Sequence, residues 1–258
     1  MYVYMPTVER GFRRVCIWGM ILTAHQPTYL PWLGLFHKIA ISDLYISYSQ
    51  VQYQTDNWNH RNRIKTPQGP QWLTLSVFRR NHMNISLNDM ILLYEKPWRQ
   101  KHWRTINQNY RKAPYFKRYV DFFEDVYQRE WGNLVELNEY MLRWFVTTLG
   151  IKTPLKADRE YQFSGSKSDR AIDMCCKTEA KVFVFGELGK KYAHTNDFNT
   201  IGCIPYFQSY IHPTYPQLYG VFEPNMSIID LLFNCGENSL EILLSNNVTK
   251  TDIQNLIK

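Results

Sequence analysis

The sequence predicts an α/β fold built on a Rossmann-like, mostly parallel sheet, with an inserted or capping block of helices. Residues 20–50 follow the order strand, turn, helix, strand, which is typical of a βαβ unit with a right-handed crossover. Residues 97–150 show helical periodicity, and from residue 151 onward helices alternate with short apolar strands again. We therefore expect residues 1–19 to be an N-terminal extension and residues 20–258 to form a single α/β domain.

The first half of the chain supplies the opening unit and a basic segment. A short buried strand is expected at residues 20–24, and a helix at residues 32–42, where apolar side chains recur at helical spacing. An alternating strand region follows Asp43. After a polar loop that carries three cations, WLTLSV (72–77) predicts a strand and ISLNDMILL (85–93) is a further strand candidate.

The second half predicts a helical block and then a return to alternating elements. Pro97 begins the block of amphipathic helices and Gly150 ends it. The expected order beyond it is a helix in 166–180, a buried strand in 181–186, a strand in 203–210, a helix in 226–236 and one or two short helices in 237–257. This order favours a parallel sheet whose strands are joined by helices.

Composition restricts the classes of protein. Hydrophobic residues make up 45% of the chain and aromatic residues 16%, which is enough for a core and argues against a disordered chain. The five cysteines form no CxxC pair and the histidines are scattered, so we expect neither a disulfide framework nor a metal site, and a reducing cytoplasmic location. No apolar run approaches ~20 residues, so no membrane span is expected.

The net charge of +7 is unevenly distributed. Residues 51–120 hold 13 Lys and Arg against 3 Asp and Glu, a net of +10, whereas the remainder has a net of −3. A localised positive charge predicts an anionic small-molecule ligand in this region, and a solvated basic surface is the alternative. No nucleic-acid-binding motif is present, so nucleic acid is not expected as a partner.

The segment HQPTYLPWLG follows the first strand directly. Ligands of open α/β sheets bind beyond the carboxyl ends of the strands, so this loop lies where a site is expected. His25 can move a proton near neutral pH, and Gln26 can both donate and accept a hydrogen bond. Tyr29 and Trp32 can stack on a ring or a sugar. We predict a catalytic role for His25 and substrate binding by the other three, with a buried histidine and packed aromatics as the alternative.

The segment HRNRIK (60–65) places three cations and an amide within six residues. Arginine side chains match phosphate or carboxylate oxygens in pairs. Arg61, Asn62, Arg63 and Lys65 are therefore predicted to bind the diphosphate of a nucleotide sugar, and a solvated basic loop is again the alternative.

Further candidates are spread along the chain. GELGKKY has glycines between a strand and a short helix, which can present backbone N–H groups to an anion. Asp230 lies among apolar neighbours on a helix, where an unpaired carboxylate is costly, so it is either a pairing carboxylate or a catalytic one. The remaining substrate-binding candidates are Gln52, His102, Gly186, Lys190, Tyr192, His212 and Gln217.

The segment HQPTYLPWLGLFHKI resembles the WbqC-like family. The likeness continues through SDLYISYSQVQYQTDNWNHRNRIKTPQGPQWLTLSV and returns at GELGKKYA, YPQLYGVFEPN and MSIIDLLFNCG, so it covers nearly the whole chain from Met20. The resemblance implies a bacterial protein of O-antigen (lipopolysaccharide) or surface-polysaccharide gene clusters that modifies a nucleotide-linked sugar. More specifically, it implies transfer of glycine or an acyl-glycyl group to the amine of a 4-amino-4,6-dideoxy sugar.

A second resemblance concerns the fold. The order strand, HQPTYLPWLG, helix, Asp43, strand is similar in layout to the HxGH nucleotidyltransferase superfamily, which has a HUP-like fold and binds ATP phosphates through two histidines. Only His25 is present here, and nothing matches the second histidine. ATP is therefore a candidate cofactor, and no other cofactor is indicated.

The leading hypothesis is an enzyme, a cytoplasmic transferase that acts on a nucleotide-activated amino sugar by N-acyl or glycyl transfer. His25 would be the general base for the sugar amine or would stabilise developing charge, while Arg61, Arg63 and Lys65 hold the diphosphate. The alternatives are an ATP-dependent ligase or nucleotidyltransferase, and a non-catalytic sugar-nucleotide-binding protein.

Overall fold

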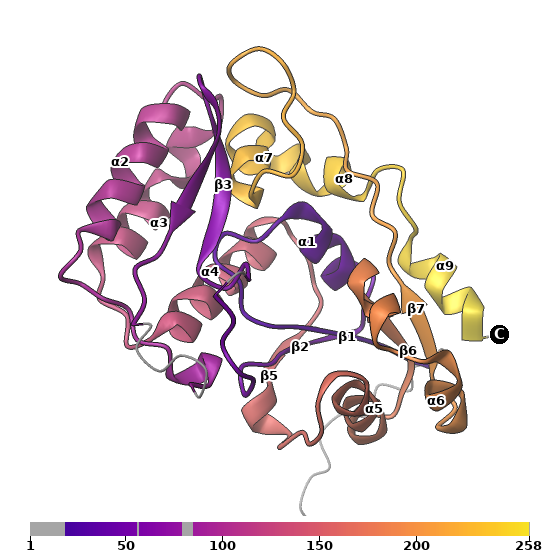
Figure 1. Cartoon of the computed structure of the whole chain (residues 1–258). Helices are drawn as coiled ribbons and strands as arrows, with labels where there is room; N and C mark the ends of the chain where they lie inside the picture. Colours follow the sequence, from indigo (N-terminus) through magenta and orange to yellow (C-terminus); the bar gives the residue numbers. More distant parts are fainter. Residues whose placement is uncertain (1–18, 56, 79–84, 258) are drawn as a thin grey trace, which may run out of the picture.

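The computed structural model describes residues 19–55, 57–78 and 85–257, and its centre is an all-parallel sheet of five strands (Figure 1). In chain order the strands are β1 (Met20–His25), β2 (Leu44–Ser47), β5 (Leu155–Ala157), β6 (Ala180–Phe185) and β7 (Ile204–Phe207). Their order across the sheet is β5-β2-β1-β6-β7. The predicted α/β fold with a Rossmann-like sheet is confirmed.

The strand order creates a topological switch point beside β1. From β1 the chain moves outward to β2 and then β5, and it later returns to the other side of β1 to form β6 and then β7. Ligands of open parallel sheets bind in the crevice outside the carboxyl ends of the strands at such a reversal. Here the two strands that flank the reversal end at His25 and Phe185.

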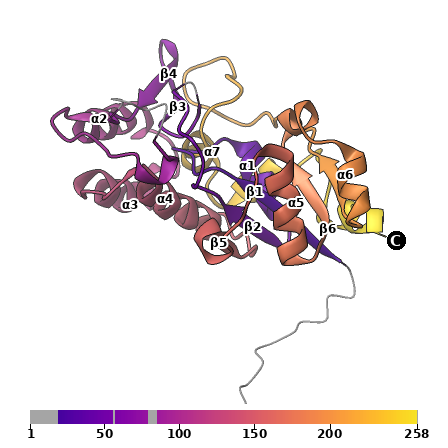
Figure 2. The ribbon, with the colours of Figure 1, turned by 60° about the horizontal axis from the view of Figure 1, so that its bottom comes forward.

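Helices cover both faces of the sheet, which explains why its strands are almost continuously apolar. On one face, α5 (Lys167–Thr178) and α6 (Thr195–Thr200) pack on a cluster that contains Leu22 and Phe183 (Figure 2). On the other, the end of α1 (Leu33–Ala40) and α9 (Lys250–Gln254) close over a cluster that contains Ile21 and Val184. Neighbouring residues of one strand therefore point to opposite faces.

The helical block lies beyond the carboxyl ends of β1 and β2 (Figure 1). It consists of α2 (Trp98–Tyr110), α3 (Phe116–Gln128) and α4 (Leu134–Thr148), and in the chain it stands between β2 and β5. The largest core cluster joins this block to α1 and to α7 (Ile228–Cys235), while α8 (Ser239–Leu244) packs on α1. No helix in the described ranges is long and apolar enough to cross a membrane.

The predictions for the segment between β2 and the helical block need correction. The basic segment is a strand, β3 (Arg61–Thr66), which pairs antiparallel with β4 (Gly69–Thr74). Asn62 occupies an inward position, and Lys65 is buried although it lies on the side of the arginines, so the usual alternation of apolar and polar residues is hidden in the sequence. The candidate strand at 85–93 is instead a 3₁₀ turn at Leu87–Asp89 with isolated bridges on each side, because the Ser86 hydroxyl accepts the Asn88 N–H and so caps a turn.

Candidate functional site

The candidate site lies at the switch point, where β1 and β6 separate. Their pairing ends at Thr23 and Val184, so the ends of the two strands are not hydrogen-bonded to each other. Gly186 follows β6 directly, and apart from its chain neighbours no heavy atom lies within 4 Å of the place that a Cβ would take. The carboxyl edge of the sheet therefore has open space close to the backbone, as a ligand site requires.

His25 is the last residue of β1, and its imidazole ring is neutral and hydrogen-bonded through one of its two nitrogens. Its Nδ1 lies 2.8 Å from the carbonyl oxygen of Gln26. Because a carbonyl oxygen only accepts, Nδ1 carries the proton and Nε2 keeps its lone pair. Burial, with a smaller contribution from the charge of Lys38, lowers the pKa of His25 to about 3. The imidazole can therefore accept a hydrogen bond through Nε2 at neutral pH.

The loop after His25 is held in place by three asparagines of the segment that precedes and begins β3. The Asn57 amide donates to the Gln26 Oε1 at 3.2 Å, and the Asn59 amide donates to the Pro27 carbonyl at 2.7 Å. The Asn62 amide donates to the carbonyl of the fourth residue after Gln26. The sequence analysis missed these roles of the asparagines, although their spacing at 57, 59 and 62 alongside the basic residues is visible in the chain.

Three tryptophans, Trp32, Trp58 and Trp72, extend from His25 and form what we call the tryptophan track. The His25 ring lies edge-on to Trp32 at 5.1 Å between ring centroids. Trp32 is 6.3 Å from Trp58, and Trp58 is 5.4 Å from Trp72. Trp58 is 36% exposed and Trp72 is 45% exposed, which is unusual for residues of this size. The outer part of the track therefore offers two accessible ring systems for stacking.

Two arginines of β3 lie over the outer end of the tryptophan track. The guanidinium carbons of Arg61 and Arg63 are 5.0 Å and 5.6 Å from the centroid of the Trp72 ring. They alternate along β3 with the buried Asn62 and Ile64, so both project from the same side of the hairpin. A cation pair beside exposed aromatic rings is suited to a ligand with both a ring and an anionic group.

Tyr29 and His102 lie inside the protein, between the loop and the helical block. The Tyr29 hydroxyl is 2.8 Å from His102 Nδ1 and 2.6 Å from the Tyr127 hydroxyl. Tyr29 is completely buried, and burial lowers the pKa of His102 to about 4. This buried triad attaches the loop after β1 to α2 and α3, and the Tyr29 ring is not open for stacking on a ligand.

Replacing Tyr29 with phenylalanine is expected to affect stability and not ligand affinity. The variant removes one hydroxyl and leaves His102 Nδ1 and the Tyr127 hydroxyl without that partner, which costs about 1–3 kcal/mol. Urea denaturation measures this loss, and the affinity for any ligand of the site serves as the second readout. A stable variant with weakened ligand binding would instead place the Tyr29 hydroxyl in the ligand site.

Asp230 is the centre of a second polar cluster, which links α7 to α2, β3 and the segment 209–225. Its carboxylate accepts hydrogen bonds from Tyr110 at 2.7 Å, Tyr215 at 3.0 Å and the Gln217 amide at 2.6 Å. The Lys65 ammonium donates to Gln217 Oε1 at 3.1 Å. Burial raises the pKa of Asp230, although these donors and the charge of Lys65 oppose the shift. Both Asp230 and Lys65 are buried, and their contacts are with protein groups.

Most of the other predicted residues lie either at the carboxyl edge of the sheet or in the segment 209–225 near Asp230. Gln26 also hydrogen-bonds Tyr48, which lies near Tyr192 at the carboxyl edge of the sheet. Lys190 is exposed in the turn after Gly186. His212 Nδ1 lies 2.9 Å from the Pro213 carbonyl, and its Nε2 accepts the Asn225 N–H, so it belongs to the segment 209–225. Gln52 is exposed and is bridged to Ser86. The functional roles of these residues stay predictions.

The sequence analysis also missed Lys38, whose side chain is buried beneath the end of β1. Its Nζ lies 2.9 Å from the Ala24 carbonyl oxygen, and burial lowers its pKa to about 7. The available signal was a lysine inside the otherwise apolar stretch of α1, where a solvated position is not expected. Within the described ranges, no three His, Cys, Asp or Glu side chains come together as a metal site needs.

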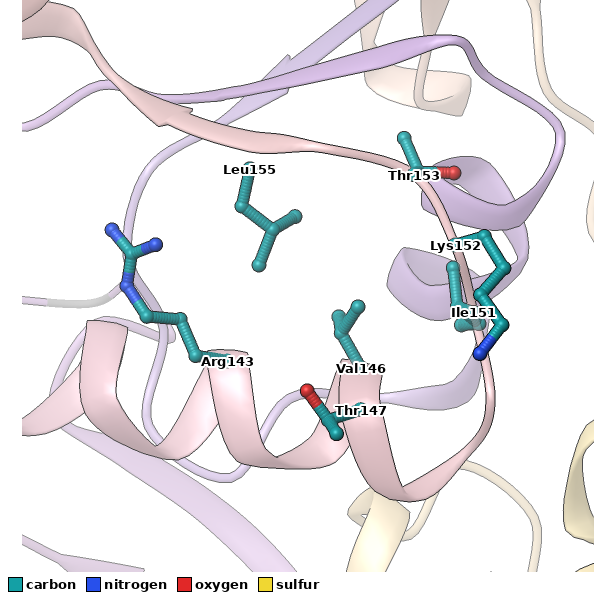
Figure 3. A pocket seen from close by; sticks show the side chains of 7 residues that line it. All are labelled: Arg143, Val146, Thr147, Ile151, Lys152, Thr153 and Leu155. Carbon is teal, nitrogen blue, oxygen red and sulfur yellow. The ribbon is translucent and has the colours of Figure 1, made fainter.

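A surface pocket of about 470 Å³ lies away from the switch point, between the end of α4 and the segment that leads into β5 (Figure 3). Its lining consists of Arg143, Val146, Thr147, Ile151, Lys152, Thr153 and Leu155. The Thr153 hydroxyl is already committed to the Ile39 carbonyl at 2.8 Å. None of the predicted site residues lines this pocket, so we do not place the functional site there.

Comparison with known proteins gives two matches. Residues 26–242 match the family model of the WbqC-like protein family, a range that begins directly after His25 and includes the tryptophan track. The chain is 33% identical over 220 residues to the uncharacterized protein Rv1507c of Mycobacterium tuberculosis, and the alignment covers 84% of this chain and 95% of that protein. No solved structure matches the chain significantly.

Proposed function

Because this chain belongs to the WbqC-like protein family, we propose that it is a transferase that modifies the amine of a nucleotide-activated amino sugar. The reaction is N-acyl or glycyl transfer, and the pathway is the biosynthesis of O-antigen or another surface polysaccharide. The family supports the pathway, and the residues at the switch point support the class of substrate.

The observation that carries this proposal is the tryptophan track with its two arginines, which leads directly to His25. A nucleotide sugar has a base that stacks on aromatic rings, a diphosphate with negative charge and a sugar with an apolar face. Trp58 and Trp72 would bind the flat groups, and Arg61 and Arg63 would bind the diphosphate. The sugar amine would then lie at His25, at the inner end of the track.

His25 has a defined role in this reaction. The amine nitrogen attacks the acyl carbonyl carbon and the new N–C bond forms, while the bond to the leaving group breaks and the leaving group departs with its electron pair and the proton that the amine loses. The Nε2 lone pair accepts a hydrogen bond from the amine and so directs the nitrogen toward the acyl carbon. Because the pKa of His25 is about 3, the ring stays available as an acceptor at neutral pH.

Nucleotide-sugar binding is the direct test. We expect a dTDP- or UDP-linked 4-amino-4,6-dideoxy sugar to bind in isothermal titration calorimetry. Trp72→Ala is expected to weaken that binding about 5- to 150-fold, since one stacked ring contributes ~1–3 kcal/mol. Phe78→Ala is the matched control, because Phe78 is 41% exposed and makes no ring contact with the track. If neither nucleotide sugar binds, or if Trp72→Ala binds the sugar with wild-type affinity, the proposal is contradicted.

An ATP-dependent ligase is the second candidate function. The observation that favours it is the position of His25 at the end of β1 beside the switch point, since this edge of a parallel sheet commonly binds nucleotide phosphates. Adenylation of a carboxylate, with release of pyrophosphate, would precede attack by the sugar amine. Formation of AMP that depends on both the carboxylate donor and the amino sugar would favour the ligase over a simple transferase.

A further inference from the structure

Lys38 has a buried amine that the described part of the protein leaves without a carboxylate partner. The residue is 3% exposed, and its ammonium group donates a hydrogen bond to the Ala24 carbonyl at 2.9 Å. Among the described residues, no Asp or Glu oxygen lies within 4 Å of its ammonium group. Burying an ammonium without a counter-charge is costly, and two of its three N–H donors remain unused.

The Lys38 ammonium lies on the side of β1 that faces the switch point. The His25 carbonyl accepts the Tyr48 N–H, so it points toward β2. Carbonyl groups alternate in direction along a strand, so the Ala24 carbonyl points toward β6. Because the pairing of β1 with β6 ends at Thr23 and Val184, this carbonyl has no partner on β6, and Lys38 binds it instead.

Gly186 lies across from this position, at the end of β6, and the protein's own structure does not require a glycine there. Its φ of −73° suits any residue, and a Cβ would have no neighbour within 4 Å. Gly189 differs, because its Cβ would come within 2.6 Å of Phe185, and Gly34 is closely packed against Trp32. The open space at Gly186 therefore lies beside the backbone at the switch point, across from the Ala24 carbonyl that binds Lys38.

We propose that Lys38 and Gly186 form an anion subsite at the switch point, which binds a phosphate or carboxylate group. This subsite is separate from Arg61 and Arg63 at the outer end of the tryptophan track, so one protein can hold two anionic groups at once. The assignment of the bound group to the second substrate, the acyl or glycyl donor, rests on the proposed function. The subsite itself rests on the placement of Lys38 and Gly186.

Lys38 is the group at this end of the described sheet that titrates near neutral pH. Burial lowers its pKa to about 7, whereas the pKa of His25 is about 3 and burial raises the pKa of Tyr45 on β2 well above its usual value. Burial lowers the pKa of His37 on the same helix, and Asp43 is paired with a lysine of α9 at 2.6 Å. An anion beside Lys38 favours its charged form, so binding is accompanied by uptake of a proton.

Proton uptake on binding is therefore the readout of the test. Calorimetric titrations at about pH 8, in two buffers with different ionisation enthalpies, measure the number of protons taken up. The probes are inorganic pyrophosphate and ATP for a phosphate group, glycine for a carboxylate, and UDP-glucose for a nucleotide sugar. We expect pyrophosphate, ATP or glycine to bind the full-length protein with uptake that approaches one proton, and the probe that binds identifies the source of the anion.

The variants separate the subsite from other effects. Lys38→Met removes the charge and keeps the length of the side chain, and we expect it to abolish the uptake and weaken binding at least about tenfold. Gly186→Ala is expected to weaken the same binding while its melting temperature is equal or higher. Lys181→Met is the matched control. Lys181 is exposed at the amino end of β6, whereas the switch point lies at the carboxyl end of that strand.

The outcomes distinguish this inference from the proposed function. Absence of binding by pyrophosphate, ATP and glycine, or unchanged uptake in Lys38→Met, overturns the subsite. If proton uptake depends on Lys38 but no nucleotide sugar binds, the subsite is upheld and the proposed function is overturned. If Lys38→Met does not fold, the decision rests on Gly186→Ala and on the wild-type uptake, and unaltered binding by Gly186→Ala overturns the subsite.

Discussion

Asp230→Ala is expected to lower the free energy of unfolding by about 3–5 kcal/mol, because it removes the fully buried acceptor at the centre of a polar cluster. Tyr110, Tyr215 and Gln217 each donate a hydrogen bond to this carboxylate. The alanine variant leaves two buried hydroxyl donors and the partly buried Gln217 amide without an acceptor, and it also opens a cavity. The affected elements are α2, α7 and the segment 209–225, so the loss is expected to be global and not confined to the site.

Chemical denaturation of three variants tests this expectation. Asp230→Asn keeps the shape of the side chain, but its NH₂ group is a donor that faces the donors of the cluster. We therefore expect a loss in the free energy of unfolding that is smaller than that of the alanine variant and still above about 1 kcal/mol. Tyr215→Phe removes a single donor and is the mild control. If Asp230→Ala is as stable as the wild type but inactive, then Asp230 is catalytic and its main role is not structural.

His25→Ala is expected to reduce kcat about 10²-fold, because the amine is no longer directed toward the acyl carbon, while the affinity for the nucleotide sugar stays within about twofold. The reason is that His25 contacts the reacting amine in the proposed reaction, whereas the arginines and the tryptophan track supply most of the binding energy. Steady-state kinetics and calorimetry measure the two quantities separately. His194→Ala is the matched control, since His194 is an exposed histidine that precedes α6.

The pH dependence gives a second test of His25. Its folded-state pKa of about 3 lies below the usual value near 6.5, so the unfolded chain binds more protons between these two pH values. The stability that depends on neutral His25 is therefore complete above about pH 6.5 and is lost as the pH falls toward 3. The rate should show no inflection from His25 near pH 6.5. Wild-type turnover by His25→Ala, or such an inflection that this variant abolishes, contradicts the role assigned here.

The opening unit of the fold could be predicted because its signals are local. An apolar strand, a loop with two prolines and a helix with regular apolar spacing each depend on near neighbours in the chain. The basic strand β3 was harder, because two polar residues on opposite sides of it, Asn62 and Lys65, are both buried. Their partners, the carbonyl of Leu30 and the amide of Gln217, are distant in sequence and leave no local signal.

The roles of the candidate site residues depended on such distant contacts. Tyr29 and Trp32 are three residues apart in one aromatic loop, yet Tyr29 is buried against α2 and α3 while Trp32 begins the tryptophan track beside His25. Arg63 and Lys65 are two residues apart on the same side of β3, but Arg63 lies over Trp72 while Lys65 is buried near Asp230. Both members of each pair are of one chemical class, aromatic or cationic, and lie in the same short segment, so the sequence alone could not separate their roles.

The sequence by itself determined the α/β class, the βαβ opening, the family and the position of His25 at the end of the first strand, because hydrophobic periodicity and short motifs are properties of neighbouring residues. The tertiary structure decided which strands flank the switch point, and therefore that His25, Lys38 and Gly186 lie near one another. Strand order arises from the packing of helices on both faces of the sheet. That packing joins residues more than 100 positions apart, and no local pattern encodes it.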